Sequence, residues 1–258
     1  MRLHIYEWGA ADAPPVVCLH GVTGHGERFL QLAEERWAEH LRVIAPDLRG
    51  HGRSGWDAPW TFETHVADLV ETIDALGVEQ PAWVGHSFGG RLVLELAAAH
   101  PERIRCAVLL EPAIDIFDYV AEAVAGLEPD EPVFESVAAY VDAHATPTTD
   151  RRRMAADLER YFDPQPDGRV RRRTSQDAVR SIFRALSSPA PAPATLTMPA
   201  LLVYAPAYGL VRDEHLEAYS GRVQVVRVPG MHHPMWDAFD ETADAIERFV
   251  LENSGAER

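Results

Sequence analysis

The pentapeptide Gly85-His86-Ser87-Phe88-Gly89 constrains the fold of this chain more than any other feature. The apolar run 82–84 before it predicts a buried strand, and the pattern over 88–100 after it predicts a helix. Small residues near Ser87 permit a sharp turn between these two elements, which would hold the serine hydroxyl above a sheet. The start of the helix would bring backbone N–H groups close to any negative charge that develops beside that hydroxyl.

Short apolar runs of the same kind recur along the chain and alternate with helical patterns. The runs are continuous rather than alternating, which predicts a parallel sheet covered on both faces. The expected strands are 16–19, 42–45, 82–84, 106–110, 201–204 and 223–228. The expected helices around them are 27–39, 62–76, 88–100, 213–220 and 236–251. This order predicts an α/β fold with a mostly parallel, doubly wound sheet.

The middle of the chain, from 115 to 193, interrupts that order because it contains no strand-like run. Four helices are expected there, at 117–125, 132–143, 151–162 and 175–186. A proline-rich stretch closes the segment and has the composition of a semi-rigid linker. We therefore predict a core formed by residues 1–114 and 196–258, with an inserted helical cap at 115–195.

The charge of the chain limits its partners and its chemistry. Forty acidic residues against 24 basic ones give a net charge of −16, which disfavours binding to nucleic acid. All the basic residues are arginines, and this excludes Schiff-base lysines, pyridoxal phosphate held by lysine and a Walker-type phosphate loop. Ten of these arginines lie between positions 151 and 184, either as a solvated helix face or as a patch that attracts an acidic substrate or partner.

Neither a bound metal nor a membrane is expected. The two cysteines, Cys18 and Cys106, lie far apart in apolar runs and have no metal-ligand spacing. The N-terminal residues 1–9 lack the apolar core of a signal peptide. The longest uncharged stretch contains five prolines, unlike a membrane helix. We expect a cytoplasmic protein that acts on a small molecule without a cofactor.

A serine nucleophile needs a base, and two adjacent histidines offer one. His232 and His233 stand between the last expected strand and the last expected helix, in a loop that can reach back over the sheet. Either could serve as the base. The first core strand ends at His20-Gly21-Val22, where a loop can direct a backbone N–H at the same point. We expect the Val22 and Phe88 N–H groups to form an oxyanion hole, and His20 to be structural.

These motifs together resemble the capped serine hydrolases of the α/β-hydrolase-fold superfamily, and the resemblance covers essentially the whole chain. It also rests on the segment 46–54, Pro-Asp-Leu-Arg-Gly-His-Gly-Arg-Ser, in which Asp47 would fix a turn. The resemblance implies that Ser87 is the nucleophile. The family's histidine usually has an acidic residue five positions later, which favours His232, followed by Asp237, over His233.

The acidic partner of the histidine departs from the common pattern. Most relatives have an aspartate just after the strand that ends at Tyr204, but residues 205–210 contain no carboxylate. Tyr208 stands about where the acid should be, and a phenol with a pKa near 10 is neutral at pH 7. Some members, among them haloalkane dehalogenases and zearalenone lactonases, use a glutamate at the end of the preceding core strand. Glu111 has that position here, with Asp213 and Asp115 as alternatives.

The resemblance implies acyl transfer, with a hydrophobic carboxylic ester or lactone as the substrate. Phe117, Tyr140, Tyr208 and Trp236 are the candidates for an aromatic pocket wall. The same framework would serve a cofactor-free C–C hydrolase, a lyase or a perhydrolase. A ligand-binding protein with a vestigial triad is the alternative from another class, and reaction with an activated-serine probe separates it from an enzyme.

Overall fold

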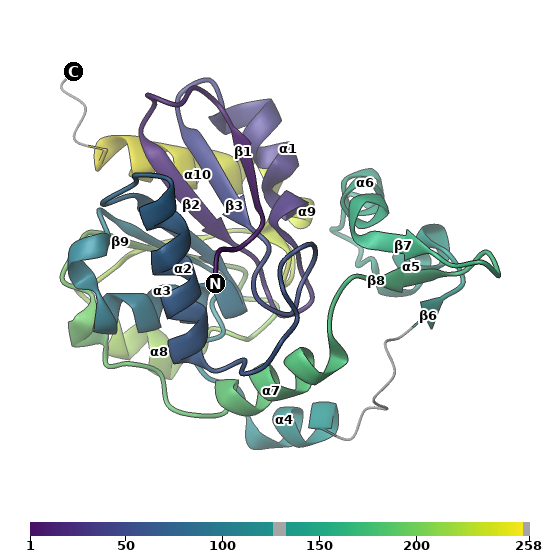
Figure 1. The fold of residues 1–258 in the computed structure, drawn as a ribbon. Helices are drawn as coiled ribbons and strands as arrows, with labels where there is room; N and C mark the ends of the chain where they lie inside the picture. Colours follow the sequence, from purple (N-terminus) through teal and green to yellow (C-terminus); the bar gives the residue numbers. More distant parts are fainter. Residues whose placement is uncertain (126–132, 255–258) are drawn as a thin grey trace.

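Seven strands form the central sheet of the computed structural model, which describes residues 1–125 and 133–254 (Figure 1). Their order across the sheet is β1-β3-β2-β4-β5-β9-β10. All neighbouring pairs are parallel except β1 and β3, so the predicted mostly parallel, doubly wound α/β sheet is confirmed. The strands are β1 Ile5–Trp8, β2 Pro15–Leu19, β3 Arg42–Pro46, β4 Ala82–His86, β5 Ala107–Leu110, β9 Ala200–Tyr204 and β10 Gln224–Arg227.

Strand register brings the predicted site residues to one edge of this sheet. Gly85 of β4 pairs with Leu19 of β2, and His86 pairs with Leu110 of β5. Residues that directly follow these three strands therefore lie beside one another at the carboxyl edge. In an open α/β sheet this edge is where ligands bind.

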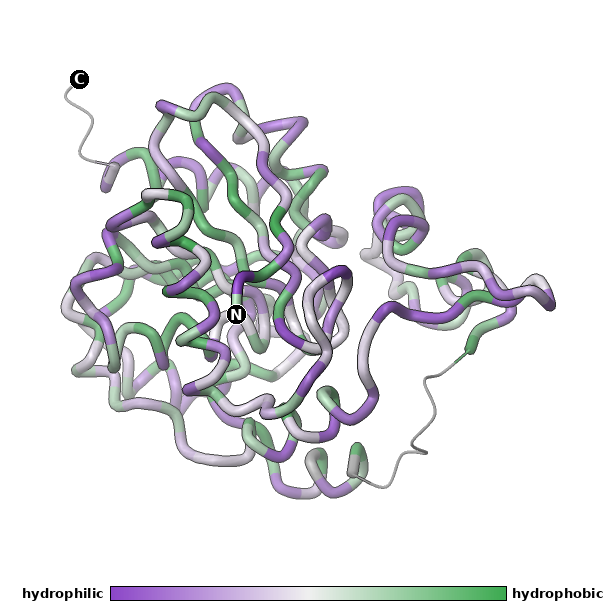
Figure 2. The backbone as a smooth tube through the Cα atoms, viewed as in Figure 1, coloured by the Kyte–Doolittle hydropathy of each residue, from purple (hydrophilic) through white to green (hydrophobic). Residues whose placement is uncertain are grey.

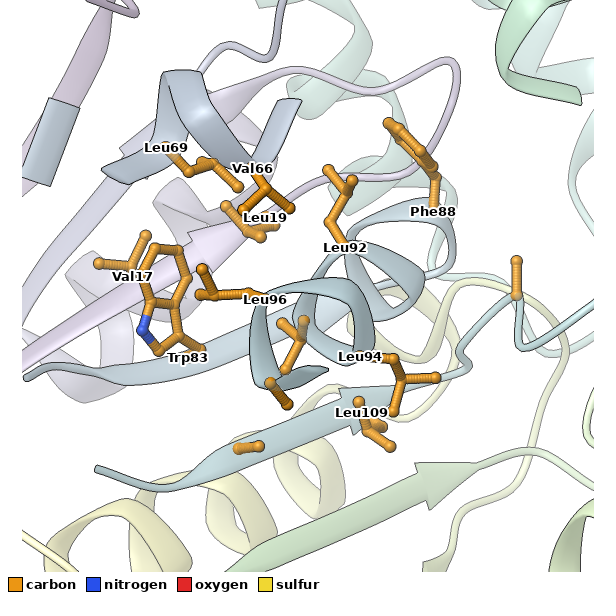
Figure 3. Packing of buried hydrophobic residues seen from close by; sticks show 14 of the residues in the cluster. Val17, Leu19, Val66, Leu69, Trp83, Phe88, Leu92, Leu94, Leu96 and Leu109 are labelled. Atoms are coloured by element: carbon orange, nitrogen blue, oxygen red, sulfur yellow. The ribbon is translucent and has the colours of Figure 1, made fainter. Parts of the chain in front are cut away.

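Helices cover both faces of the sheet, and alternate residues of each strand pack into the two layers. One layer holds α2 and α3 against Val17, Leu19 and Trp83 (Figure 3). The other holds α10 against Val16 and Cys18. The apolar colour of the central strands in Figure 2 reflects this burial on both sides. The helices in these parts of the chain are α2 Phe62–Ala75, α3 Phe88–Ala99, α8 Asp213–Ala218, α9 Pro234–Asp237 and α10 Phe239–Glu252.

Two of the expected helices are less regular than the sequence pattern indicated. The segment predicted as a helix at 27–39 is a 3₁₀ turn, η1 Gly26–Phe29, then α1 Leu30–Leu32 and a π-helical stretch, η2 Ala33–Trp37. The last helix, predicted at 236–251, is divided at Ala238. The φ of Ala238 is −145°, which is not helical, so α9 ends there and α10 begins after it. Periodicity alone does not reveal such breaks.

The middle segment contains strands, so the prediction of helices alone between 115 and 193 is wrong. Its helices are α4 Asp118–Ala125, α5 Val137–His144, α6 Arg151–Tyr161 and α7 Gln176–Leu186. Between them lies an antiparallel sheet in the order β6-β8-β7, formed by Val133–Phe134, Val170–Arg172 and Phe162–Pro164. These strands have two or three residues each, and β8 is mostly arginine, so no apolar run announces them.

The middle segment divides into two groups of elements in Figure 1. Helices α4 and α7 lie side by side, with α7 packed on the core, while α5, α6 and the small sheet form a separate group to the right of the core in Figure 1. The predicted start of a helix at Pro132 lies outside the described residues. The division into a core and a cap at 115–195 stays a prediction. Within the described part of the chain, no helix is long and apolar enough to cross a bilayer.

Candidate active site

Ser87 occupies the sharp turn between β4 and α3, with backbone angles that few non-glycine residues adopt. Its φ is 55° and its ψ is −114°, a conformation that costs on the order of 1–3 kcal/mol. The Ser87 N–H donates to the Leu110 carbonyl at 3.0 Å, and the Ser87 carbonyl accepts from the Ala113 N–H at 3.0 Å. These bonds to the residues at the end of β5 hold the strained turn in place.

Two glycines of the pentapeptide are required by close backbone contacts. A Cβ on Gly85 would lie 2.3 Å from the carbonyl oxygen of Gly89. A Cβ on Gly89 would lie 2.2 Å from the carbonyl oxygen of Leu19. Only residues without a side chain let α3 approach both its own preceding strand and the neighbouring β2 this closely.

His232 reaches Ser87 from the loop between β10 and α9. Its Nε2 lies 3.0 Å from the Ser87 Oγ, the reach expected between a general base and the hydroxyl that it deprotonates. The Met231 N–H donates to Asp237 Oδ2 at 2.7 Å and braces this loop. Asp237, the residue that favoured His232 in the sequence, therefore lies directly under the histidine loop.

His233, the alternative base, contacts Arg28 and Trp236. Its Nδ1 lies 3.4 Å from Nη1 of Arg28, and its ring centroid is 4.2 Å from that of Trp236. Burial, with the nearby His232 and Arg28, lowers the pKa of His233 well below its usual value. His233 is thus a neutral ring in the wall of the site.

Glu111 directly follows β5, and its fully buried carboxylate lies beside the His232 ring. Its N–H donates to the Val203 carbonyl at 2.8 Å, with φ at 43°. Oε1 accepts the N–H of Ala205, while Oε2 lies 3.7 Å from Nδ1 of His232. Oε2 and Nδ1 are both buried without a hydrogen-bond partner among the described residues. A small rotation that closes this gap would therefore satisfy both atoms.

The alternative acids are placed differently. Asp213 is exposed in the first turn of α8. Asp115 forms an ion pair with Arg212, and its Oδ1 lies 3.4 Å from Nε2 of His215. Of the three carboxylates weighed from the sequence, the structure brings Glu111 to His232.

Tyr208, which replaces the usual acid in the sequence, stacks on His232. The two ring centroids are 4.6 Å apart, and the planes differ by 22°. Burial and then the charge of Glu111 raise the pKa of the Tyr208 phenol. A neutral ring that covers the imidazole cannot balance its positive charge as a carboxylate does.

The loop after β2 passes directly beside Ser87. A Cβ on Gly21 would lie 3.1 Å from the Ser87 Cβ. In the part of the chain that the structure describes, the N–H groups of Val22 and Phe88 have no acceptor. His20 holds this loop, since its Nδ1–H donates to the Gly21 carbonyl at 2.8 Å. The two predicted oxyanion donors thus lie in the segments that flank the serine.

Two cavities meet at His232. One cavity, of about 350 Å³, is lined by Ser87, by the Asp115–Arg212 ion pair and by side chains of α4 and α7 that include Val120, Phe183 and Leu186. We call it the apolar cavity after these α4 and α7 side chains. The other cavity, of about 360 Å³, lies between the histidine loop and α5 and α6, and we call it the polar cavity after the polar side chains named next. Its lining includes His144, Thr146, Thr149 and Arg172. Five residues line both cavities, namely Thr23, Arg28, Tyr208, His232 and His233.

The aromatic residues predicted to line a substrate pocket are divided between these cavities. Phe117 lines the apolar cavity, whereas Tyr140 and Trp236 line the polar one. Tyr208 lines both. The described residues contain no group of three or more histidine, cysteine, aspartate or glutamate side chains arranged to hold a metal ion.

Two residues at the site were missed by the sequence reasoning. His86 donates from Nε2 to the carbonyl of His232 at 2.7 Å, and burial lowers its pKa well below the usual value. Arg28 lines both cavities, and its Nε lies 2.8 Å from Oδ2 of Asp157 on α6. The variable second position of the Gly-x-Ser-x-Gly pattern pointed weakly to His86. No sequence signal pointed to Arg28.

Comparison with known proteins agrees with this architecture. A family model described as alpha/beta hydrolase fold matches residues 14–202. Lipase LipV of Mycobacterium tuberculosis is 34% identical over 186 residues, which cover 69% of this chain and 68% of the lipase. A 2-hydroxymuconate semialdehyde hydrolase from a Pseudomonas species is 39% identical over 119 residues, 44% of this chain and 41% of that protein.

A solved structure extends the likeness to nearly the full chain. The E-2-(acetamidomethylene)succinate hydrolase is 25% identical, with a TM-score of 0.84 over 96% of this chain and 94% of that one. The nucleophile-elbow geometry, the strand order and these matches agree with one another. The chain therefore belongs to the alpha/beta hydrolase fold family.

Proposed function

We propose that this protein is a serine hydrolase that cleaves a carboxylic ester or a lactone through an acyl-enzyme. The observation that carries the proposal is the position of His232 between Ser87 and Glu111. One ring nitrogen lies 3.0 Å from the Ser87 Oγ, and the other lies 3.7 Å from a buried Glu111 oxygen. A nucleophile, a base and a group that orients the base are the three parts of such a triad.

The geometry gives each group a step. His232 Nε2 takes the proton of Ser87, and Oγ attacks the substrate carbonyl to form a new C–O bond. The resulting oxyanion accepts hydrogen bonds from the Val22 and Phe88 N–H groups. His232 then gives its proton to the leaving alkoxide as the original ester bond breaks. Water then gives a proton to the same nitrogen and attacks the acyl carbon; the bond from that carbon to Oγ breaks, and Oγ takes the proton back from His232 as the acid leaves.

Glu111 has a supporting part in this mechanism. Its carboxylate keeps the proton of the neutral imidazole on Nδ1, so that Nε2 is free to accept one. It also stabilises the imidazolium that forms after proton transfer. Because the Glu111 side chain is fully buried, its charge acts on His232 with little screening by water.

A C–C hydrolase is the second candidate, because one relative carries that kind of name. The 2-hydroxymuconate semialdehyde hydrolase matches 44% of this chain at 39% identity. The two activities share the serine, the base and the oxyanion donors. They differ in the leaving atom that must be protonated. This atom is a carbon in C–C cleavage and an oxygen in ester cleavage.

Covalent labelling with a fluorophosphonate, read by intact mass and peptide mapping, tests the activated serine. We expect one label on Ser87 in the native protein, and none in Ser87→Ala or His232→Ala. Ser220→Ala is the matched control, because Ser220 is exposed after α8 and should not affect labelling. A folded protein that takes no label would contradict the proposal and favour a binding protein with a vestigial triad.

Hydrolysis of aryl esters and lactones separates the first candidate from the second. We expect the unlabelled protein to hydrolyse phenyl butanoate. This activity should fall in proportion to the fraction of Ser87 that carries the label. Labelling of Ser87 without hydrolysis of any ester or lactone would favour C–C cleavage.

A further inference from the structure

The arginine-rich stretch of the middle segment is mostly engaged in ion pairs with neighbouring carboxylates. Six of its ten arginines pair in this way, and their charges are thereby balanced at the surface. The pairs are Arg151–Asp142, Arg153–Glu35, Arg160–Glu27, Arg169–Asp167, Arg173–Asp163 and Arg180–Asp177. These six arginines therefore belong to a solvated surface that is stabilised by salt bridges.

Arg172 differs from these arginines because its side chain lines the polar cavity. It lies on β8, where successive side chains point to opposite faces, so exposed Arg171 faces solvent instead. The Arg172 Nε is buried and has no hydrogen-bond partner among the residues that the structure describes. Within the described residues, no carboxylate forms an ion pair with Arg172, whose guanidinium carbon lies 5.4 Å from the centre of the Phe134 ring.

Arg28 adds a second guanidinium to the same cavity. It is buried at 6% exposure, with its Nε 2.8 Å from Asp157 Oδ2 and its guanidinium carbon 4.6 Å from the Trp236 ring centre. His25 binds the other oxygen of Asp157 at 2.8 Å. Arg28 is therefore held in one position, and it lines both cavities.

The carboxylate in the lining of the polar cavity is already engaged. Asp237 accepts the Met231 N–H on Oδ2 at 2.7 Å and the Thr149 hydroxyl on Oδ1 at 2.8 Å. It braces the histidine loop rather than pairing with Arg172. A cavity with one unpaired guanidinium and one fixed guanidinium is suited to a planar, bidentate anion such as a carboxylate.

The two cavities have different relations to Ser87. The apolar cavity is lined by Ser87 and Val22, whereas the lining of the polar cavity includes His232 but not Ser87. The leaving oxygen takes its proton from His232, so its substituent lies on the His232 side of the reacting carbon. The polar cavity is thus on the side of the leaving group, and the apolar cavity is on the acyl side.

We propose that the polar cavity binds the alcohol half of the substrate through a carboxylate held by Arg172 and Arg28. This inference rests on the proposed ester hydrolysis and names its substrate class. The substrate is an ester with an apolar acyl group and a hydroxy acid as its alcohol. The strongly acidic surface repels anions in general, so this cavity would select them locally.

Binding to the inactive Ser87→Ala protein tests the anion site without turnover. The probes are 4-hydroxybenzoate and its neutral match 4-hydroxybenzamide, compared by titration calorimetry. We expect the anion to bind about tenfold more tightly, as a charge-assisted hydrogen bond provides. Arg172→Met on this background should remove the preference. Arg172→Lys should keep part of it, and Arg171→Met, the matched change on the other face of β8, should keep all of it.

Hydrolysis of paired esters tests the side on which the anion binds. The pair with the charge in the alcohol is 4-butanoyloxybenzoate and 4-butanoyloxybenzamide. The pair with the charge in the acyl half is the phenyl monoester of succinate and phenyl butanoate. Native kcat/KM should favour the anion only in the first pair. Every variant is tested on the same esters, so differences in the chemical reactivity of the esters cancel when the kcat/KM ratios of two variants are compared. Arg172→Met should reduce the preference for the anion in the first pair about tenfold.

The outcomes separate this inference from the proposed function. Equal or undetectable binding of the two probes, or a preference that survives Arg172→Met, would overturn the anion site even if neutral esters are hydrolysed. A preference confined to the second pair would overturn the placement of the leaving group. If the anion binds as expected but no ester is hydrolysed and no fluorophosphonate label forms, the proposed function fails and the anion site stands.

Discussion

His86 donates a hydrogen bond from its ring Nε2 to the main-chain carbonyl of His232, at 2.7 Å, across 146 residues of sequence. The residue next to Ser87 therefore fixes the loop that carries the candidate base. His86 touches no reacting atom in the proposed mechanism, so its part is to position His232.

Replacing His86 with alanine should remove this anchor. We expect kcat to fall by about ten- to a hundredfold, because misplacing a catalytic group by about 1 Å has effects of that size. KM should change less than kcat, since His86 is one of many residues that line the cavity beside Ser87. Steady-state kinetics on phenyl butanoate measure both constants. His86→Gln, which keeps an N–H donor of similar reach, should recover part of kcat, and an unchanged kcat in His86→Ala would contradict the positioning role.

Replacing Glu111 with glutamine distinguishes it from the alternative acids. We expect kcat to fall by about 10³- to 10⁴-fold, because an amide beside Nδ1 neither fixes the tautomer nor stabilises the imidazolium. Asp213→Asn is the matched control and should leave kcat within about twofold of native, as for most surface substitutions. Circular dichroism would check that both variants fold. The reverse order of effects would make Asp213 the acid.

Tyr208 should act through its ring rather than its hydroxyl. Tyr208→Phe keeps the stacking on His232, so we expect kcat to stay within about twofold of native. Tyr208→Ala uncovers the imidazole and should lower kcat about tenfold, since the ring would lose its fixed orientation. Kinetics of the two variants on the same ester provide the comparison. A large loss in Tyr208→Phe would show that the hydroxyl has a chemical part.

Gly89 should tolerate no side chain, because a Cβ there would lie 2.2 Å from the Leu19 carbonyl oxygen. We expect Gly89→Ala to lower the free energy of unfolding by about 3 kcal/mol or more, as overpacking against backbone does. For a chain of this size that lowers Tm by about 6–12 °C. Scanning calorimetry measures the change.

Gly77→Ala is the control for backbone strain without a steric clash. Gly77 has a φ of +67°, and a Cβ added there would meet no atom of the described residues within 4 Å. Its substitution should lower the free energy of unfolding by about 1 kcal/mol. Equal losses in the two variants would refute the packing argument for Gly89.

Asp157 should stabilise the attachment of α6 to the core in a pH-dependent manner. Burial alone would raise the pKa of its carboxyl, but Arg28 and His25 outweigh burial and lower it. The unfolded chain therefore binds the proton more readily than the folded one. The stabilisation is complete above about pH 5 and decreases as the pH falls below about 3.9 toward the folded pKa.

Urea unfolding of the native protein and of Asp157→Asn between pH 3 and pH 7 tests this sign. We expect Asp157→Asn to cost about 3–5 kcal/mol at neutral pH, because it leaves Arg28 buried without its counter-charge. The difference between the two proteins should shrink toward pH 3. A difference that is constant with pH would contradict the ionic role of Asp157.

The sequence predicted those parts of the molecule whose signals are local. The sharp turn at Ser87 and the position of Glu111 at the end of a strand were each predicted from a few adjacent residues. The five-residue spacing from His232 to Asp237 is equally local. The structure places all of these at one edge of the sheet.

What the sequence did not predict depends on partners that are distant in the chain or on elements without an apolar run. The partner of His86 lies 146 residues away, and that of Arg28 is on α6. Strand β8 consists of Val-Arg-Arg and forms only because β6 and β7 flank it. Which of several carboxylates faces His232 is likewise settled by strand register rather than by composition.

The position of Glu111 also has an evolutionary consequence. The common family pattern described from the sequence has an aspartate in the loop after β9, whereas here that loop supplies the Ala205 N–H to the Glu111 carboxylate. Every residue except proline carries such a group, so sequence drift at position 205 leaves the hydrogen bond to the Glu111 carboxylate intact. With Tyr208 kept on the imidazole, a lineage that inherited Glu111 is therefore free to diversify residues 206, 207 and 210, and with them the shape of its binding site, without altering the candidate triad.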